Sequence, residues 1–432
     1  MGNFPGEGRG ILYIRFLENY MLANEIKTSL SEPATLERLY RQNPVAFKST
    51  FLAIYPEIEK EPTAQIWHAR LIYASEDLAW GQSTDWAFLG IWVIVAAFFM
   101  QFPDIFGISH DAYFPRNVSF IVLAGMGGLF IFQQQLRLSG IWPALVALLF
   151  SMVYMNAIPM DSKSDVFALA CIHVPIFLWI FVGYLYVGGL NPAGPKGIEF
   201  LRFHGDLLVM TALIVLAGGL FTALTINLFH LINLDIEKYY FQYGVVSLLP
   251  AVPVLAAFLV QKNPHLVSKI SPLIARIFTP LVFLTLLLFL GATFFTEKDL
   301  FNDREYLLVF NGVLVGVMAL LLFSLSEVTK KSFNKFYQYV VVGLAALALI
   351  DNGLALSAII FRLAEFGISP NRLAVLGSNL LMMAHVAWVT KNLIAFVQGK
   401  QEIRSVENSM TGFLPYYGAW AALVAFVFPL VF

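Results

Sequence analysis

Charged residues are scarce in this chain of 432 residues, where Asp, Glu, Lys and Arg together make up 13%. An average soluble domain has about 25%. The net charge is −1, so no basic field is present that would attract nucleic acid. The single cysteine, Cys171, excludes an internal disulfide framework and a multi-cysteine metal site. Hydrophobic residues reach 59% and occur in long runs, which predicts a polytopic membrane protein rather than a large soluble core.

Familiar catalytic and cofactor-binding motifs are also missing. No Glu stands in a zincin arrangement with a His, and there is no G-x-S-x-G elbow. The nearest approach to a phosphate-binding loop is GLNPAGPKG at 189–197, but Pro195 separates Gly194 from Lys196 and no strand precedes it. We interpret it as a flexible connection. The sequence thus predicts no catalytic residue, no metal ligand and no cofactor, and it argues against an enzyme.

Long hydrophobic runs begin after residue 84 and continue to the end of the chain. Each is long enough at 1.5 Å per residue to cross a hydrocarbon core of about 30 Å, the first only just. We therefore predict an all-α fold, with about eleven transmembrane helices in a domain at 85–432 embedded in a lipid bilayer. The predicted spans are 86–102, 117–134, 140–158, 165–188, 205–232, 240–260, 273–295, 306–325, 337–361, 372–396 and 413–431.

The first 84 residues differ, because basic and acidic side chains alternate there too closely for a span. Pro44 after Asn43 and Pro62 after Glu61 are typical of a capped helix start, which predicts three or four short helices. The stretch ILYIRFLENYMLANEI at 11–26 is amphipathic. It could lie on the membrane surface or belong to a small helical bundle. Region 1–84 could also dock a cytoplasmic protein partner.

Basic residues in the connections predict the orientation. The side shared with the N-terminal region carries twelve of them: Arg137, Lys196, Arg202, Lys262, Lys269, Arg276, Lys330, Lys331, Lys335, Lys391, Lys400 and Arg404. The opposite side carries seven: Arg116, Lys163, Lys238, Lys298, Arg304, Arg362 and Arg372. Because cytoplasmic connections carry an excess of Lys and Arg, the N-terminus is predicted to be cytoplasmic and the C-terminus to lie on the other side of the membrane.

A polar turn, EFGISPNR at 365–372, separates the ninth and tenth predicted spans. Gly367 lies just past the ninth span, where glycine can adopt the left-handed cap conformation. Ser369 followed by Pro370 is typical of an N-cap and a first-turn proline that open the next helix. Arg362 and Arg372 flank the turn and could reach lipid headgroups. We interpret this stretch as a tight connection between two antiparallel helices.

The same stretch carries a family resemblance. RLAEFGISPNRLAVL resembles the signature of a bacterial membrane-protein family catalogued as domain of unknown function 4153. The stretches FLRFHGDLLVMTALIVLAGGLFTALTINLF, LVSKISPLIARIFTPLVFLTLLLF and NDREYLLVFNGVLVGVMALLLFSLSE are also similar to it, so that the likeness covers roughly residues 165–397. The motif positions are Arg362, Glu365, Gly367, Ser369, Asn371 and Arg372. The resemblance implies a many-helix protein of the bacterial inner membrane and implies no activity. Together with the orientation predicted from the basic residues, an inner-membrane location would put the C-terminus in the periplasm.

Four polar residues fall inside predicted spans, near the middle of the membrane. We count 1.5 Å per residue from the side of the membrane opposite the N-terminus. Asp351 then lies about 16 Å deep, His385 about 20 Å and His173 about 12 Å. Asn352 follows Asp351 directly. Ionisable side chains in the membrane are costly, so they are functional hypotheses by default. A carboxylate with one or two imidazoles could relay protons or coordinate a cation.

A structural alternative remains for these residues. Asp351 could be a neutral acid that is hydrogen-bonded to Asn352, Asn379 or a backbone carbonyl. Two functions stay open accordingly. One is a transporter or ion- or proton-conducting protein with a polar midplane site. The other is a membrane-anchored interaction or assembly protein whose N-terminal region docks a partner. A lipid-modifying enzyme has the least support.

Overall fold

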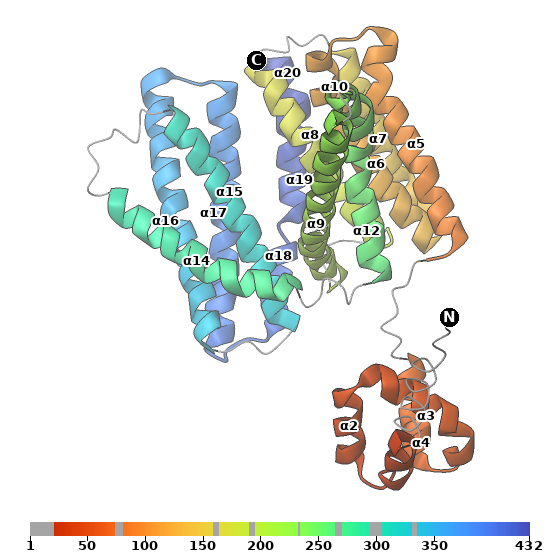
Figure 1. Ribbon diagram of the computed structural model, residues 1–432. Coiled ribbons are helices and arrows are strands. Elements are labelled where there is room, and N and C mark those ends of the chain that lie inside the picture. Colours follow the sequence, from red (N-terminus) through yellow and green to blue (C-terminus); the bar gives the residue numbers. More distant parts are fainter. Residues whose placement is uncertain are drawn as a thin grey trace. The chain divides into compact units, whose positions relative to one another are not determined.

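The chain is helical wherever its structure is described. The structure is a computed structural model, and it describes residues 21–73, 81–158, 164–189, 195–231, 234–263, 270–293, 304–330 and 335–432. Every regular element in these ranges is a helix. The chain divides into two compact units, Met1–Ala79 and Trp80–Phe432 (Figure 1).

The first unit is a small helical bundle with its own core. Residues 21–28 are helical and are followed by α2 (Pro33–Gln42), α3 (Pro44–Ile58) and α4 (Pro62–Tyr73). The predicted helix start at Asn43 is confirmed, because its side chain accepts a hydrogen bond of 3.1 Å from the backbone N–H of Ala46. The bundle interpretation is also confirmed for 21–26, because Ile26 is fully buried in the core. Residues 11–20 of the amphipathic stretch lie outside the described residues. The core consists of Ile26, Leu36, Leu39, Phe47, Phe51, Ile54, Ile58, Ala64, Trp67 and Leu71.

Ion pairs on the surface of this unit join its helices. Arg70 of α4 donates a hydrogen bond of 2.7 Å to Glu37 of α2, and Arg41 donates one of 2.9 Å to the same carboxylate. The first of these bonds, with help from the second, lowers the pKa of Glu37 from its usual value. The Arg70 guanidinium also lies 4.5 Å from the centre of the Trp67 ring. These contacts tie the edges of α2 and α4 together.

The second unit contains the predicted spans. Ten helical segments in its described part are long and apolar enough to cross a membrane. Eight of them are single helices, and each overlaps one predicted span. These eight are α5 (Ser83–Phe106), α6 (His110–Gln134), α7 (Leu138–Ala157), α8 (Asp165–Tyr186), α9 (Pro195–Leu231), α14 (Ile270–Thr293), α16 (Lys335–Phe366) and α17 (Pro370–Val397). The remaining two segments are Glu237–Lys262 and Ile403–Val431. The one predicted span left over, 306–325, which is the eighth along the chain, lies within α15 (Arg304–Lys330), where the shorter stretch Phe310–Ser326 is apolar.

The two composite segments differ from the uniform helices that the sequence predicts. Segment Glu237–Lys262 consists of α10 (Glu237–Tyr239), a π-helical turn at Tyr240–Val245, α11 (Val246–Leu248), a 3-10 turn at Leu249–Ala251 and α12 (Val252–Lys262). Pro250 lies in the 3-10 turn, where a residue without an N–H disturbs the regular ladder. Segment Ile403–Val431 begins with a separate helix, α18 (Ile403–Thr411), which was not predicted. It continues as α19 (Leu414–Ala422), a π-helical turn at Leu423–Val427 and α20 (Phe428–Val431).

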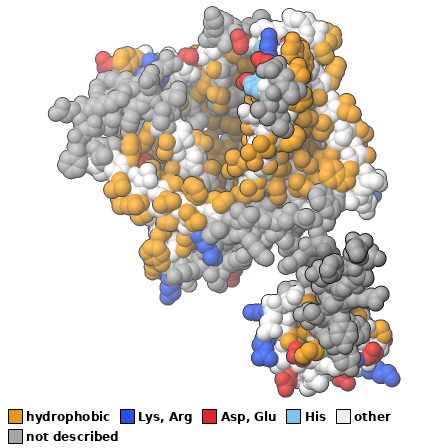
Figure 2. Space-filling view, in the orientation of Figure 1, with side chains coloured by type: hydrophobic (Ala, Val, Ile, Leu, Met, Phe, Trp, Pro, Cys, Tyr) orange, Lys and Arg blue, Asp and Glu red, His pale blue; other side chains and the backbone are white. Residues whose placement is uncertain are grey.

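Large apolar side chains cover much of the outside of the second unit. On α9, Leu208, Leu216 and Phe221 are 72%, 70% and 65% exposed. Figure 2 shows hydrophobic side chains across the visible face and charged ones mainly towards its ends. Exposed apolar surface of this extent marks an interaction with a membrane or a partner. Combined with the long apolar helices, it identifies an integral membrane protein.

The helices of this unit pack around two main apolar clusters. One cluster joins α14, α15, α16, α17 and α18, and it contains Leu321, Val341, Leu344 and Val389. The other joins α5, α6, α7, α8, α9 and α12 around Phe130, Phe200 and Phe258. In Figure 1 the first group is drawn in green-cyan to blue and the second in orange to green. Helices α8 and α17 are in contact, as are α8 and α19, which connects the two groups.

Candidate functional site

The connection between α16 and α17 has the predicted geometry. Gly367 has φ +75°, and its N–H donates a hydrogen bond of 3.0 Å to the Leu363 carbonyl. Ser369 Oγ accepts a hydrogen bond of 3.3 Å from the Arg372 N–H, and Pro370 is the first residue of α17. The left-handed glycine, the N-cap serine and the first-turn proline are therefore all confirmed.

Arg372 of this turn makes hydrogen bonds to the backbone. Arg372 Nη1 donates hydrogen bonds of 2.8 and 2.7 Å to the carbonyls of Phe366 and Gly367. These carbonyls lie at the end of α16, where the helix cannot satisfy them itself. The guanidiniums of Arg362 and Arg372 lie 5.9 and 5.5 Å from the centre of the Phe366 ring. Glu365 is exposed and Asn371 is half-buried. Of the motif positions, Gly367, Ser369 and Arg372 thus cap the two helix ends that meet at this turn.

Replacement of Gly367 by valine should lower the yield of folded protein. Only glycine adopts its positive φ without strain, so a β-branched side chain costs about 1 kcal/mol or more, although nothing lies within 4 Å of the added Cβ. The yield of monodisperse protein after detergent extraction measures this effect. Gly218→Val is the matched control, because Gly218 lies within α9 and also has open space around it. A normal yield combined with lost activity would instead make the turn a binding element.

Asp351 is the most unusual residue of the predicted midplane set. It lies in α16 and has no exposed surface. Both of its carboxyl oxygens are buried without a hydrogen-bond partner among the described residues, and so is Oδ1 of the neighbouring Asn352. The side chain of Asn379 is engaged elsewhere, since its Nδ2 donates a bond of 2.7 Å to Asn311 Oδ1. The partners suggested by the structural alternative are therefore not bonded to Asp351.

The direction of the Asp351 side chain follows from its helix. An added Cβ on Gly353 would lie 3.7 Å from Met383 of α17, so that this face of α16 is turned towards α17. Successive residues are rotated by about 100° around a helix, which turns Asp351 about 160° away from that face. Ala348 and Ala355, which lie about one turn before and after Asp351, are buried in the apolar cluster that α16 shares with α14, α15, α17 and α18. Asp351 therefore leaves α16 on the side away from α17.

His385, the second residue of the predicted midplane set, contacts helices other than α16. It is fully buried in α17. Its Nδ1 lies 3.2 Å from the Tyr417 hydroxyl, and its Nε2 lies 3.1 Å from the Ser409 carbonyl oxygen. The ring is stacked on Phe413, with ring centres 4.7 Å apart. Both nitrogens thus have partners in α18 and α19, which assigns His385 to the packing of the C-terminal helices.

His173 is held by its own helix. It is buried in α8, and its Nδ1 lies 2.8 Å from the Leu169 carbonyl oxygen, so Nδ1 carries the proton. No hydrogen bond or ion pair between described residues joins His173 or His385 to Asp351. Of the four residues predicted at the midplane, Asp351 and Asn352 are the two with buried side-chain oxygens that have no hydrogen-bond partner among the described residues, and Asp351 is therefore the candidate site.

A buried hydroxyl cluster was not predicted. The Thr279 hydroxyl lies 2.6 Å from that of Ser324 and 3.1 Å from that of Tyr337, so that the cluster links α14, α15 and α16. Tyr337 lies on the same side of α16 as Asp351 but fourteen residues earlier, about 21 Å along the helix. That separation is too long for direct proton transfer. The only signal in the sequence is the presence of Ser, Thr or Tyr in each apolar run, and each run contains more than one such residue, so the pattern identifies no cluster.

Comparison with known proteins adds no family to this description. No protein-family model, no curated protein and no solved structure matches the chain. The site must therefore be interpreted from its own geometry: a carboxyl group and an amide oxygen, both buried, in the middle of a membrane-spanning helix.

Proposed function

We propose that this protein is a transporter or an ion- or proton-conducting protein in which Asp351 takes up and releases the transported ion. The observation that carries the proposal is the unpartnered carboxyl of Asp351, buried in α16 beside the unpartnered oxygen of Asn352. Burial of a polar group without a hydrogen bond costs a few kcal/mol, and burial of an isolated charge costs far more. A residue that contributes only to packing would not need such a group.

The chemistry of these atoms favours a cation or a proton. An ionised carboxylate and an amide oxygen offer acceptors only. Their natural complement is a proton on the carboxyl or a cation that both oxygens contact. Because Asp351 has no exposed surface in this conformation, exchange of the ion requires α16 to separate from its neighbours in the course of transport. Such a motion would admit the ion from one side of the membrane at a time, as alternating access requires.

The membrane and the orientation belong to the same proposal. The resemblance around the 365–372 turn supports a bacterial inner membrane. The excess of twelve basic residues over seven supports a cytoplasmic N-terminus and a periplasmic C-terminus.

Asp351→Asn should abolish ion flux while leaving the protein folded. Asparagine keeps the shape of the carboxyl but cannot change its charge. The wild-type protein and the variant are reconstituted into liposomes that contain a pH-sensitive dye. A K⁺ gradient with valinomycin then drives proton uptake, and an imposed Na⁺ gradient is tested in parallel.

Asp111→Asn is the matched control for this assay, because Asp111 is exposed in the first turn of α6. We expect wild-type flux from the control and background flux from Asp351→Asn. Equal flux from both variants would contradict a role for Asp351, and background flux from the wild type under both gradients would contradict transport of these ions.

Labelling at the two ends of α16 should reveal the orientation. Lys335 at its start and Ile368 just beyond its end are both exposed. In a Cys171→Ser background, Ile368→Cys should react with a membrane-impermeant maleimide in intact cells. Lys335→Cys should react only after permeabilisation. The opposite pattern would reverse the proposed topology.

The second candidate function, an assembly protein, is favoured by the separate core of the first unit. Deletion of residues 1–79 distinguishes the two functions. A transporter built around Asp351 should keep its flux in liposomes without the first unit. An assembly protein should instead lose the cellular partners that co-purify with the full chain, and Asp351→Asn should leave these partners bound.

A further inference from the structure

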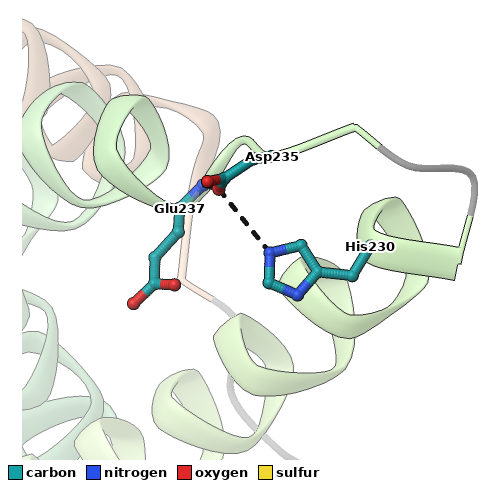
Figure 3. A group of neighbouring side chains, drawn as sticks. All are labelled: His230, Asp235 and Glu237. Carbon is teal, nitrogen blue, oxygen red and sulfur yellow. Dashed lines mark hydrogen bonds and ion pairs between the residues drawn. The ribbon is translucent and has the colours of Figure 1, made fainter.

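A separate group of polar side chains lies where α9 ends and α10 begins. His230 is in the last turn of α9, Glu237 is the first residue of α10, and Asp235 lies two residues before it (Figure 3). His230 Nε2 and Asp235 Oδ1 are 3.6 Å apart. The three groups can each offer one ligand atom, and these atoms all lie within 4.8 Å of one another. All three residues are exposed.

The spacing suits a small metal ion. Imidazole nitrogen and carboxylate oxygen bind Zn²⁺ at about 2.0–2.2 Å, so neighbouring ligands in a tetrahedral site lie about 3.3–3.6 Å apart. The His230–Asp235 distance already falls at this spacing. The carboxylate oxygen of Glu237 must move by about 1 Å or slightly more to come to the same spacing from the other two ligand atoms. An exposed side chain can make this movement by changing its rotamer. Mixed nitrogen and oxygen ligands favour Zn²⁺ and similar transition-metal ions over Ca²⁺ or Mg²⁺.

The backbone holds one ligand in place. The Glu237 N–H donates a hydrogen bond of 3.1 Å to Asp235 Oδ1, which fixes the Asp235 carboxylate at the start of α10. The ion would therefore join the end of one membrane-spanning helix to the start of the next. Two carboxylates and a neutral imidazole would leave the fourth position to water.

A His–Asp ion pair alone would not need the third ligand. The chain contains such a pair at another helix end, where His110 Nε2 lies 2.9 Å from Asp104 Oδ1. In the described part of the chain, the cluster of His230, Asp235 and Glu237 is the one group of three or more potential ligands at this spacing. We propose that these three residues form a binding site for a divalent transition-metal ion, with Zn²⁺ as the best fit.

Metal titration of the full chain tests this proposal. The protein is purified in detergent through a tag without histidine, stripped with a chelator, and titrated with Zn²⁺ against a fluorescent zinc indicator. Co²⁺ is added in parallel, because its visible absorption reports coordination by four ligands. The variants are His230→Ala and Glu237→Gln, and His110→Ala is the matched control. All substituted side chains are exposed, and a thermal melt checks that each variant is folded.

We expect one equivalent of Zn²⁺ to bind to the wild type and to His110→Ala. Each ligand variant should bind about tenfold more weakly or worse, since loss of even an outer-shell partner of a metal site costs 10- to 100-fold. The Co²⁺ absorption band should disappear in the same variants. Equal affinity in all four proteins, preference for Mg²⁺ or Ca²⁺, or no Zn²⁺ binding to the wild type would each overturn the site. None of these results depends on whether the protein transports an ion.

Discussion

Asp351→Ala should raise the midpoint of thermal unfolding in detergent, although it removes the residue on which the proposed function depends. Neither carboxyl oxygen has a hydrogen-bond partner in the described structure. Removal of an unsatisfied buried polar group recovers its desolvation cost, about 1–3 kcal/mol. Alanine also has a higher helix propensity than aspartate, which adds a few tenths of a kcal/mol.

Asp351→Asn is the comparison that separates the effect of a buried polar group on stability from the effect of side-chain shape. The asparagine amide would also be buried without a partner, so its midpoint should stay near that of the wild type. Thermal melts of the wild type, Asp351→Ala and Asp351→Asn measure the differences between their midpoints, and light scattering recorded in parallel detects aggregation. A midpoint below that of the wild type for Asp351→Ala would contradict the prediction, because it would mean that the carboxyl makes a stabilising bond in the folded protein.

Opposite effects on stability and flux would explain why α16 contains this residue. Functional sites often keep groups that destabilise the fold, and their removal commonly stabilises the protein. A stabilising Asp351→Ala without any loss of flux would leave the carboxyl without a function.

Local features of the fold could be predicted from the sequence, because short-range physics determines them. Apolar runs of sufficient length became helices, including α5, α8 and α16. Asn43 before Pro44 is a helix cap. Gly367 has a positive φ, because its place just past a helix and before Ser-Pro leaves few alternatives.

Features that depend on the rotation of a helix could not be predicted. Residue counts predict a similar depth for Asp351 and His385, but depth does not define the direction of a side chain. The partners of His385 are 24 and 32 residues away, in α18 and α19. Helix α18 itself was not predicted, because it is short and lacks a hydrophobic run. The hydroxyl cluster likewise joins residues 45 and 58 positions apart.

The uniform apolarity of the spans is the physical reason for this limit. In a soluble helix, the polar face shows which side is turned to solvent. In a span, lipid-facing and protein-facing side chains are both apolar, as exposed Leu216 on α9 and buried Leu344 on α16 illustrate. Composition therefore reveals that a helix crosses the membrane but not which of its faces is packed.

His385→Ala should strongly destabilise the protein, in contrast to the substitutions at Asp351. The imidazole is fully buried, contacts Tyr417 and Ser409 through its two nitrogens and stacks on Phe413. Truncation of a buried ring to alanine costs about 3–5 kcal/mol, and the partner atoms lose their hydrogen bonds as well. The thermal midpoint in detergent measures the loss, and His110→Ala on the exposed end of α6 is the control that should leave it unchanged.

The double variant of Asp351→Asn and His385→Ala then tests whether the two residues belong to one site. They lie on adjacent helices but leave them in different directions and share no hydrogen bond among the described residues. Their effects on stability should therefore add to within about 0.5 kcal/mol, as expected for independent positions. In the flux assay, His385→Ala protein that is still folded should retain activity, because its partners lie in α18 and α19. A coupling energy of about 1 kcal/mol or more, together with loss of flux in the His385 variant, would instead place the imidazole beside the carboxyl during transport.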